Sequence, residues 1–294
     1  MNKVIVILGP TAVGKTKMSV ELAKKLNGEI INADSTQVFK TLDIATAKIT
    51  EEEKEGIVHH LFDIKDVEDS YTVYDYQKDC RRMIDDILKR GKTPILVGGT
   101  GLYIKAALYN YNFDEISVHN DYSKYTDDEL YSKLLAIDPH TEIHKNNRKR
   151  VEHALDVYEA TGKIVGHEKS DELLYETIFI GLTTDRNVLY ERINKRVDVM
   201  LENGLLDEAK KVYDSNIRTK AILTPIGYKE LFPYFAKEKS LEECLDLIRQ
   251  NSRKYAKRQY TWFNNQMNVT WFNVDFNNFN NTITEVYDYI KKRN

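Results

Sequence analysis

Short apolar runs alternate along the chain with longer stretches in which apolar residues recur at helical spacing. The apolar runs of strand length are residues 3–8 (KVIVIL), 29–33 (EIINA), 94–97 (PILV) and 178–183 (IFIGLT). A helix is predicted from Thr72 to Arg90, because Thr72 and Asp75 form a capping signal and Gly91 follows the last periodic residue. Strands separated by helices predict an α/β fold with a parallel sheet flanked by helices.

The amino-acid composition and the hydrophobic pattern change after about residue 112. From there the chain is rich in tyrosine and charged residues and shows no strand pattern before residue 178. This change predicts a smaller helical insertion domain at 113–177, carried by a core formed from 1–112 and 178–294. Helical patterns return at 186–213 and 241–263, and a short helix is expected near the end.

Composition limits the class of protein. With 294 residues and 41% apolar side chains, the chain can bury a core without disulfides. Cys80 and Cys244 are far apart and have no Cys or His partners at zinc spacing, which fits a reducing cytoplasm. The first apolar run is too short for a membrane span, so no membrane partner is expected. The net charge of −3 leaves any nucleic-acid binding to local basic clusters.

A phosphate-binding P-loop of the form GxxxxGK[ST] follows the first strand and precedes a predicted helix from about residue 15 to 26. The candidate diphosphate-binding residues are Gly9, Pro10, Thr11, Ala12, Val13, Gly14, Lys15 and Thr16. Backbone N–H groups of such a loop surround phosphate oxygens, Lys15 adds a positive charge, and the Thr16 hydroxyl can reach Mg²⁺. The expected ligand is a diphosphate or triphosphate, but the motif alone does not identify it.

Asp34 follows the strand at 29–33 and therefore lies at the edge of the sheet where α/β proteins bind their ligands. Taken alone, an aspartate in this place is more often a turn residue whose carboxylate accepts backbone N–H groups. The neighbouring motifs, described next, favour a functional role for Asp34 over a role in the turn alone.

Six segments occur in a fixed order: GPTAVGKT, INADSTQVF, LDIATAK, HHLFDI, ILVGGTGLYIKAAL and YAKRQYTWF. This succession closely resembles the bacterial tRNA dimethylallyltransferases, also called isopentenyl-tRNA transferases. The resemblance covers nearly the whole chain and is weakest between about 113 and 140. It implies a P-loop NTPase-like core with a helical insertion, and transfer of a dimethylallyl group from its diphosphate to N6 of adenosine 37 in tRNA.

The resemblance also implies roles for individual residues. Asp34 matches the general base, Thr100 matches a position that helps to hold the target base, and Lys15 belongs to the cradle for dimethylallyl diphosphate. Mg²⁺ is the implied cofactor, with Thr16 as its protein ligand. A monomer is expected.

The tRNA-binding candidates fall into a strand-edge group and two basic clusters. The first group is Asp34, Ser35, Thr36, Gln37 and Thr100, the insertion supplies Asn146, Asn147, Arg148, Lys149 and Arg150, and the C-terminal helix supplies Arg253, Lys257 and Arg258. By resemblance, the insertion cluster contacts the anticodon stem-loop. Arg253 and Lys257 are four residues apart, so they share a helix face suited to a phosphate backbone.

Two alternatives stay open at this point. A small-molecule or nucleoside kinase also pairs a P-loop with a second-strand aspartate, although ILVGGTG lacks the acidic residue that usually ends a Walker-type strand. The second alternative is a non-catalytic RNA-binding module gated by a nucleotide.

The roles of several other residues are predicted to be structural. Core packing is favoured over base stacking for Trp262 and Phe263, and a structural role is favoured over metal binding for His59 and His60. Thr224 and Pro225 depart from the residues common in the family before GYKE.

Overall fold

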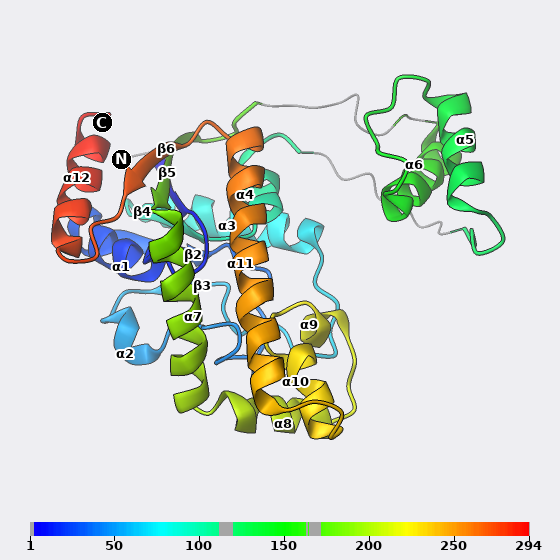
Figure 1. Ribbon diagram of the computed structural model, residues 1–294. Coiled ribbons are helices and arrows are strands. Elements are labelled where there is room, and N and C mark those ends of the chain that lie inside the picture. Colours follow the sequence, from blue (N-terminus) through cyan, green and yellow to red (C-terminus); the bar gives the residue numbers. More distant parts are fainter. Residues whose placement is uncertain (1–2, 112–119, 163, 165–171, 294) are drawn as a thin grey trace. The chain divides into compact units, whose positions relative to one another are not determined.

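The computed structural model describes residues 3–111, 120–162, 164 and 172–293 (Figure 1). The chain forms two compact units: a core unit of residues 1–108 and 173–294, and an insertion unit of residues 109–172. The boundary expected at 112 and 113 lies outside the described residues. At the other boundary, Glu176 and Thr177 already belong to a strand of the core sheet, so that strand begins two residues earlier than the sequence predicted.

Six parallel strands form one sheet in the core unit, which confirms the predicted α/β class. They are β1 (Lys3–Leu8), β2 (Gly28–Asn32), β3 (His59–His60), β4 (Thr93–Gly98), β5 (Glu176–Thr183) and β6 (Thr270–Asn273), in the spatial order β3-β2-β4-β1-β5-β6. The chain therefore places β4 between β1 and β2. Because parallel strands end at the same edge, the segments after these three strands meet there. The sequence pattern missed β3 and β6, which have only two and four residues.

Helices cover the sheet. Those before the insertion are α1 (Lys15–Leu26), α2 (Glu51–Lys54), α3 (Val73–Lys89) and α4 (Gly101–Leu108). The predicted capping box is present, since the Thr72 side chain accepts from the Asp75 N–H and the Asp75 side chain accepts from the Thr72 N–H. Ile5 and Ile7 of β1 pack in one apolar cluster with α1 and with α12 (Phe279–Lys291).

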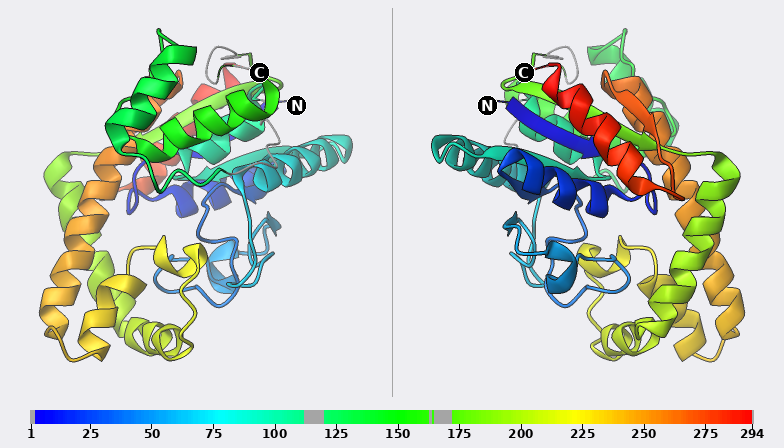
Figure 2. Two further views of the ribbon diagram at one scale, coloured as in Figure 1. Left: turned by 90° about the vertical axis from the view of Figure 1, so that its right-hand side faces the viewer. Right: turned by 90° about the vertical axis from the view of Figure 1, so that its left-hand side faces the viewer.

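A second apolar cluster joins the remaining core helices to the loop after β2. These helices are α7 (Arg186–Glu202), α8 (Leu205–Asp214), α9 (Lys220–Leu223), α10 (Tyr228–Phe235) and α11 (Leu241–Gln266). The stretch 186–213, predicted as helical, forms two helices that are separated near Gly204. Gly204 is the N-cap of α8 and has a φ of 96°, which glycine adopts readily. Helices α7 and α11 contact each other and run side by side in Figures 1 and 2. They form one wall of the site described below.

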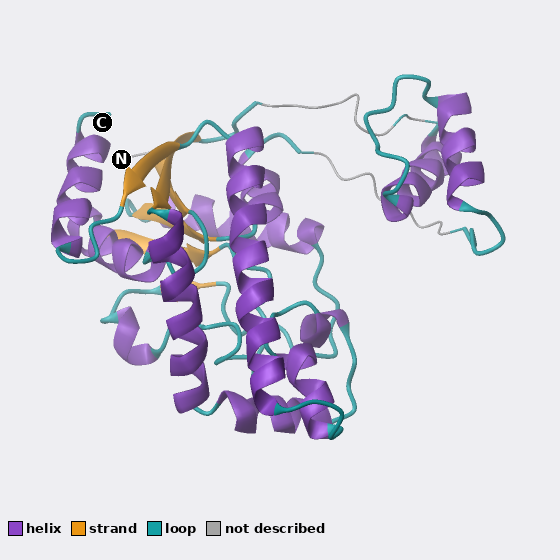
Figure 3. Cartoon of the chain, viewed as in Figure 1, coloured by secondary structure: helices purple, strands orange, loops and turns teal. Residues whose placement is uncertain are grey.

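The described part of the insertion unit contains helices and loops but no strand (Figure 3). Its helices, α5 (Asp127–Ile137) and α6 (Arg148–Thr161), pack against each other through Leu130, Leu134, Val151 and Ala154. Across the described ranges, no helix of either unit is both long and apolar enough to cross a membrane.

Candidate active site

A cavity of about 480 Å³ opens at the carboxyl ends of β1, β2 and β4. Its walls include residues 11–16 after β1, residues 34–37 after β2, and Gly98 at the end of β4. Side chains of α7 and α11 close it on another side. Each described lining residue belongs to the core unit.

The P-loop places a cation inside a tight backbone turn. Gly9 has a φ of 140°, and a Cβ at this position would lie 2.5 Å from the carbonyl oxygen of Leu182 on β5. Lys15 Nζ donates to the carbonyl oxygens of Gly9 and Pro10 at 3.0 and 2.8 Å. Burial lowers the pKa of Lys15 to about 7, with the charge of Arg196 acting in the same direction and Asp34 opposing it. An anion placed here would favour the charged ammonium.

Asp34 is half-buried and lines the cavity beyond the end of β2. Its Oδ1 accepts the Thr36 N–H at 2.9 Å and the Thr36 hydroxyl at 2.7 Å, so the turn role considered from sequence is real. Within the described residues its Oδ2 makes no hydrogen bond. Buried Asn32 holds the backbone, accepting from the Asp34 N–H at 2.9 Å and donating to the Asp34 carbonyl at 3.1 Å.

Thr100 reaches the site through Ser35 rather than as part of the cavity lining. Its hydroxyl accepts the Ser35 N–H at 3.1 Å and donates to the Ser35 hydroxyl at 3.3 Å. Its backbone N–H donates to the carbonyl of Ala33 at 3.2 Å. These contacts tie the loop after β4 to the residues that carry Asp34.

Arg196 on α7 is a site residue that the sequence did not identify. It lines the cavity, and burial lowers the pKa of its guanidinium while the charge of Asp34 opposes that shift. Arg192 and Arg196 are one helical turn apart, but Arg192 donates to the carbonyl of Ala12 and stacks on Phe276. The sequence shows that Arg192 and Arg196 lie on the same helix. Only the packing of α7 shows that Arg196 is the one that lines the cavity.

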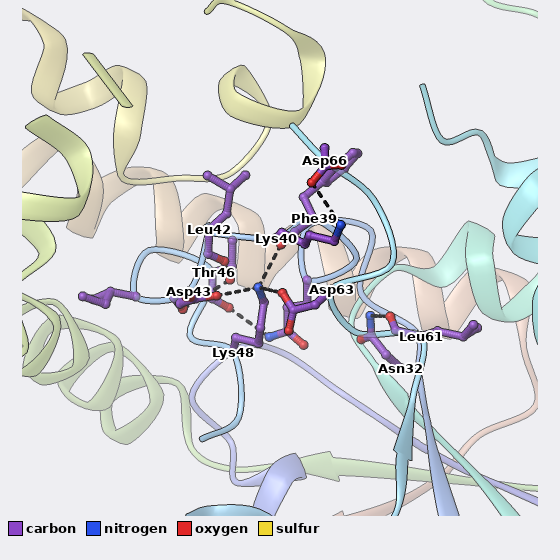
Figure 4. A network of polar contacts seen from close by, with 12 residues as sticks. Asn32, Phe39, Lys40, Leu42, Asp43, Thr46, Lys48, Leu61, Asp63 and Asp66 are labelled. Atoms are coloured by element: carbon purple, nitrogen blue, oxygen red, sulfur yellow. Dashed lines mark hydrogen bonds and ion pairs between the residues drawn. The ribbon is translucent and has the colours of Figure 1, made fainter. Parts of the chain in front are cut away.

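The loop between β2 and α2 is fixed by side chains from several directions. The Lys48 side chain is 6% exposed, and its ammonium donates to Asp43 Oδ1, Asp63 Oδ1 and the Phe39 carbonyl at 2.5, 2.6 and 2.8 Å (Figure 4). All three ammonium donors are thereby satisfied. Gln37 donates to the carbonyls of Thr46 and Ala47, which line the cavity.

Glu208 on α8 holds the same loop from the opposite wall. Its carboxylate accepts the backbone N–H groups of Asp43, Ile44 and Ala45 at 2.9–3.0 Å and the hydroxyl of buried Tyr228 at 2.7 Å. The helical wall and the loop are therefore joined by hydrogen bonds as well as by the apolar cluster.

The basic residues of α11 differ in whether carboxylates pair with them. Arg249 is paired with Asp198, Glu242 and Asp246 at 2.6–2.9 Å. Arg253 donates to Asn194 Oδ1 at 2.6 Å, whereas Lys257 and Arg258 are exposed and Arg258 lines the cavity. The predicted residues Arg253, Lys257 and Arg258 all lie on α11, and Arg249, one turn before Arg253, is held in ion pairs by α7 and the start of α11.

The two aromatic side chains near the end of α11, Trp262 and Phe263, differ in burial. Phe263 is fully buried, which confirms core packing for this ring. Trp262 is half-buried and fills the space above Gly101, where a Cβ would lie 2.0 Å from its ring.

In the insertion unit, Arg148 is engaged within the unit. Its guanidinium donates to Asp127 and Glu152 at 2.7 Å and to the carbonyls of Tyr122 and Tyr125 at 2.8 and 3.0 Å. Its neighbours differ: Lys149 and Arg150 are exposed on the first turn of α6, and Asn146 and Asn147 precede the helix in an exposed turn. The cluster predicted from sequence therefore contains one cross-linking arginine and two exposed cations.

No group of three or more metal-ligating His, Cys, Asp or Glu side chains occurs in the part of the chain that the structure describes. His60 contacts Glu29, and His59 contacts the carbonyl of Ile57. Thr16 lines the cavity next to Lys15 and offers one neutral oxygen. Mg²⁺ retains water and binds through few protein ligands when phosphates supply the others, so this donor set fits a magnesium ion that binds together with a diphosphate.

Comparison with known proteins agrees with this geometry. A family model described as "IPP transferase" matches residues 37–266. The chain is 50% identical to the tRNA dimethylallyltransferase of Anoxybacillus flavithermus over 99% of this chain and 96% of that protein. The chain belongs to the IPP transferase family. This finding confirms the resemblance inferred from the six motifs.

Solved structures of the family are similar as well. The full-length tRNA isopentenylpyrophosphate transferase of Bacillus halodurans matches with a TM-score of 0.78 and 46% identity, covering 99% of this chain and 96% of that one. A eukaryotic dimethylallyltransferase acting on tRNA matches with a TM-score of 0.87 and 31% identity, covering 99% of this chain and 80% of that one. The P-loop-like α/β core is therefore a property that this chain shares with its family.

Proposed function

We propose that this chain is a tRNA dimethylallyltransferase, which transfers the dimethylallyl group of dimethylallyl diphosphate to N6 of adenosine 37 in tRNA. The observation that carries the proposal is the joint placement of a P-loop cation, Lys15, and a carboxylate, Asp34, on the wall of one cavity. Relatives named tRNA dimethylallyltransferase match nearly the full chain and support the same activity. The kinase alternative has no such support, and β4 ends in Gly98 rather than in an acidic residue.

The chemistry assigns a task to each side of the cavity. The exocyclic amine of adenine is a weak nucleophile, because its lone pair is delocalised into the ring. Asp34 takes the N6 proton as the bond from N6 to the first allyl carbon forms, and the carbon–oxygen bond to diphosphate breaks with its electron pair leaving on oxygen. Charge grows on the departing diphosphate, so Lys15, Arg196 and the P-loop amides stabilise the transition state more than the ground state.

Magnesium has a limited part in this proposal. Thr16 would hold the ion at the diphosphate, where its charge would offset that of the leaving group. The protein groups named above would hold the diphosphate and the adenine.

The tRNA has to deliver an extruded base to Asp34, and a single-stranded anticodon loop makes that extrusion less costly. We assign the base end of the cavity to Asp34, Ser35, Thr36 and Gln37, with Thr100 holding Ser35. The exposed cations Lys257 and Arg258, together with Arg253, are assigned to the phosphate backbone. Asn146, Asn147, Lys149 and Arg150 are assigned to the anticodon stem. The enzyme is proposed to act in the cytoplasm and as a monomer.

The test is a transfer reaction with labelled dimethylallyl diphosphate, magnesium and unmodified tRNA, run beside a parallel reaction with ATP. Label on the tRNA without ATP hydrolysis supports the proposal. ATP consumption without label would replace it with a kinase or a nucleotide-gated module.

A further inference from the structure

The side chain of Gln259 links two loops of the site that follow the adjacent strands β1 and β4. Gln259 lies on α11, lines the cavity and is 5% exposed. Its Oε1 accepts the Thr11 N–H of the P-loop at 3.0 Å. Its Nε2 donates to the carbonyl oxygen of Gly99, in the loop after β4, at 3.1 Å. One amide group thus joins the segment after β1 to the segment after β4.

The Gln259 amide satisfies both partners at once, since it carries an acceptor oxygen and a donor N–H₂. The Thr11 N–H needs an acceptor and the Gly99 carbonyl needs a donor, and buried backbone groups without a partner are costly. A carboxylate offers no donor to Gly99, and an apolar side chain satisfies neither group. The space is also closed, because a Cβ on Gly99 would lie 2.0 Å from Gln259 Nε2.

The connection continues to the general base. Thr100 follows Gly99 directly, and its backbone and hydroxyl bond to Ala33 and Ser35, the two neighbours of Asp34. The chain of contacts therefore runs from the P-loop through Gln259 and Thr100 to the residues flanking Asp34. Tyr255, one helical turn before Gln259, also lines the cavity, where burial and the charge of Asp34 raise the pKa of its hydroxyl.

We infer that Gln259 is a positioning residue that fixes the separation between the diphosphate cradle and Asp34. The inference rests on the proposed prenyl transfer, in which the allyl carbon and N6 must approach to about 3–3.5 Å in line. A displacement of about 1 Å can lower the rate about 100-fold while each substrate still binds. Loss of Gln259 should therefore lower kcat and leave both KM values nearly unchanged.

The first variant is Gln259→Met, which keeps the approximate length of the side chain and removes both hydrogen bonds. We expect kcat to fall about 10-fold to 100-fold, with KM for dimethylallyl diphosphate and for tRNA within about threefold of the wild type. Gln250→Met is the matched control, because Gln250 is exposed on the same helix and its side chain accepts only from Lys254 among the described contacts. Its kcat should equal that of the wild type.

The second variant, Gln259→Glu, separates positioning from a general loss of folding. Its carboxylate keeps the acceptor for Thr11 but faces the Gly99 carbonyl with an oxygen, whereas its protonated form donates to Gly99 again. The ratio of its kcat to that of the wild type should therefore rise as pH falls. Failure of the wild type to transfer the prenyl group would refute the proposed function itself. If the wild type is active, unchanged kcat in Gln259→Met, or a pH-independent ratio in Gln259→Glu, would overturn the role of Gln259.

Discussion

The ammonium group of Lys15 lies 2.8 Å from the carbonyl oxygen of Pro10, so the P-loop cation is bound by the loop's own backbone. Burial lowers its pKa from 10.5 to about 7. The fraction of Lys15 that carries a charge therefore changes near neutral pH, and anion binding is coupled to it.

That coupling predicts proton uptake on ligand binding. A bound diphosphate raises the pKa of Lys15, so binding above pH 7 adds a proton to the complex. The affinity for dimethylallyl diphosphate should fall as pH rises above 7, by up to about tenfold per pH unit. Calorimetry in two buffers of different protonation enthalpy at pH 8 measures the uptake. Lys15→Arg, which stays charged, should take up no proton through this residue, and equal heats for wild type in both buffers would refute the coupling.

The basic row of α11 should carry part of the salt dependence of tRNA binding. Replacing Arg253, Lys257 and Arg258 by glutamine should weaken binding and flatten the slope of log affinity against log salt, by up to about one unit for each phosphate that the row no longer neutralises. Arg249→Gln is the control on the same helix, because three carboxylates already neutralise Arg249. An equal slope for the triple variant and the wild type would place the row away from the tRNA.

Within the insertion unit, stability and tRNA binding should depend on different cations. Arg148→Ala removes the bonds to Asp127, Glu152 and two carbonyls, and we expect a lower unfolding midpoint, measured by urea unfolding of the full chain. Lys149 and Arg150 are exposed, so their joint replacement by glutamine should leave the unfolding midpoint unchanged while weakening tRNA binding. An unchanged unfolding midpoint for Arg148→Ala, or unchanged tRNA binding for the Lys149 and Arg150 double variant, would contradict these separate roles.

Glu208 should stabilise the loop that carries residues 43–45. Glu208→Gln leaves one oxygen to accept three backbone N–H groups and brings its own N–H₂ against them, so we expect a loss of about 1–3 kcal/mol and reduced transfer activity. Asp207→Asn, the exposed neighbour on α8, serves as the control and should change stability by less than about 0.5 kcal/mol. Equal unfolding midpoints for both variants would show that the loop does not depend on Glu208.

The sequence predicted the parts of the site that local order determines. A P-loop must follow a strand and start a helix, and Asp34 must lie at a strand end, so both could be placed at one edge of the sheet. The sequence did not find Arg196 or the bridging role of Gln259. Both depend on which face of α7 and α11 packs toward the sheet, and helical spacing alone does not identify that face.

The ion-pair partners of the basic residues also depended on tertiary neighbours. Arg249 and Arg253 look equivalent in the sequence, but Asp198, about 50 residues earlier on α7, forms an ion pair with Arg249, and no ion pair to Arg253 occurs among the described residues. Arg148 looks like Lys149, but its partners Tyr122, Tyr125 and Asp127 lie more than 20 residues away. Strand β6 was missed because it is short and follows a long helix, so only its pairing with β5 defines it.

The most direct test of the site is a single-turnover transfer of labelled dimethylallyl groups to tRNA by the wild type and by Asp34→Asn, with tRNA affinity measured in parallel. Asparagine keeps the shape of Asp34 and the bond to the Thr36 N–H, but it cannot take the N6 proton. We expect label on adenosine 37 with the wild type, a rate about 10²-fold to 10⁴-fold lower with Asp34→Asn, and similar tRNA affinity. Equal rates for the two proteins would contradict the role of Asp34 as the base.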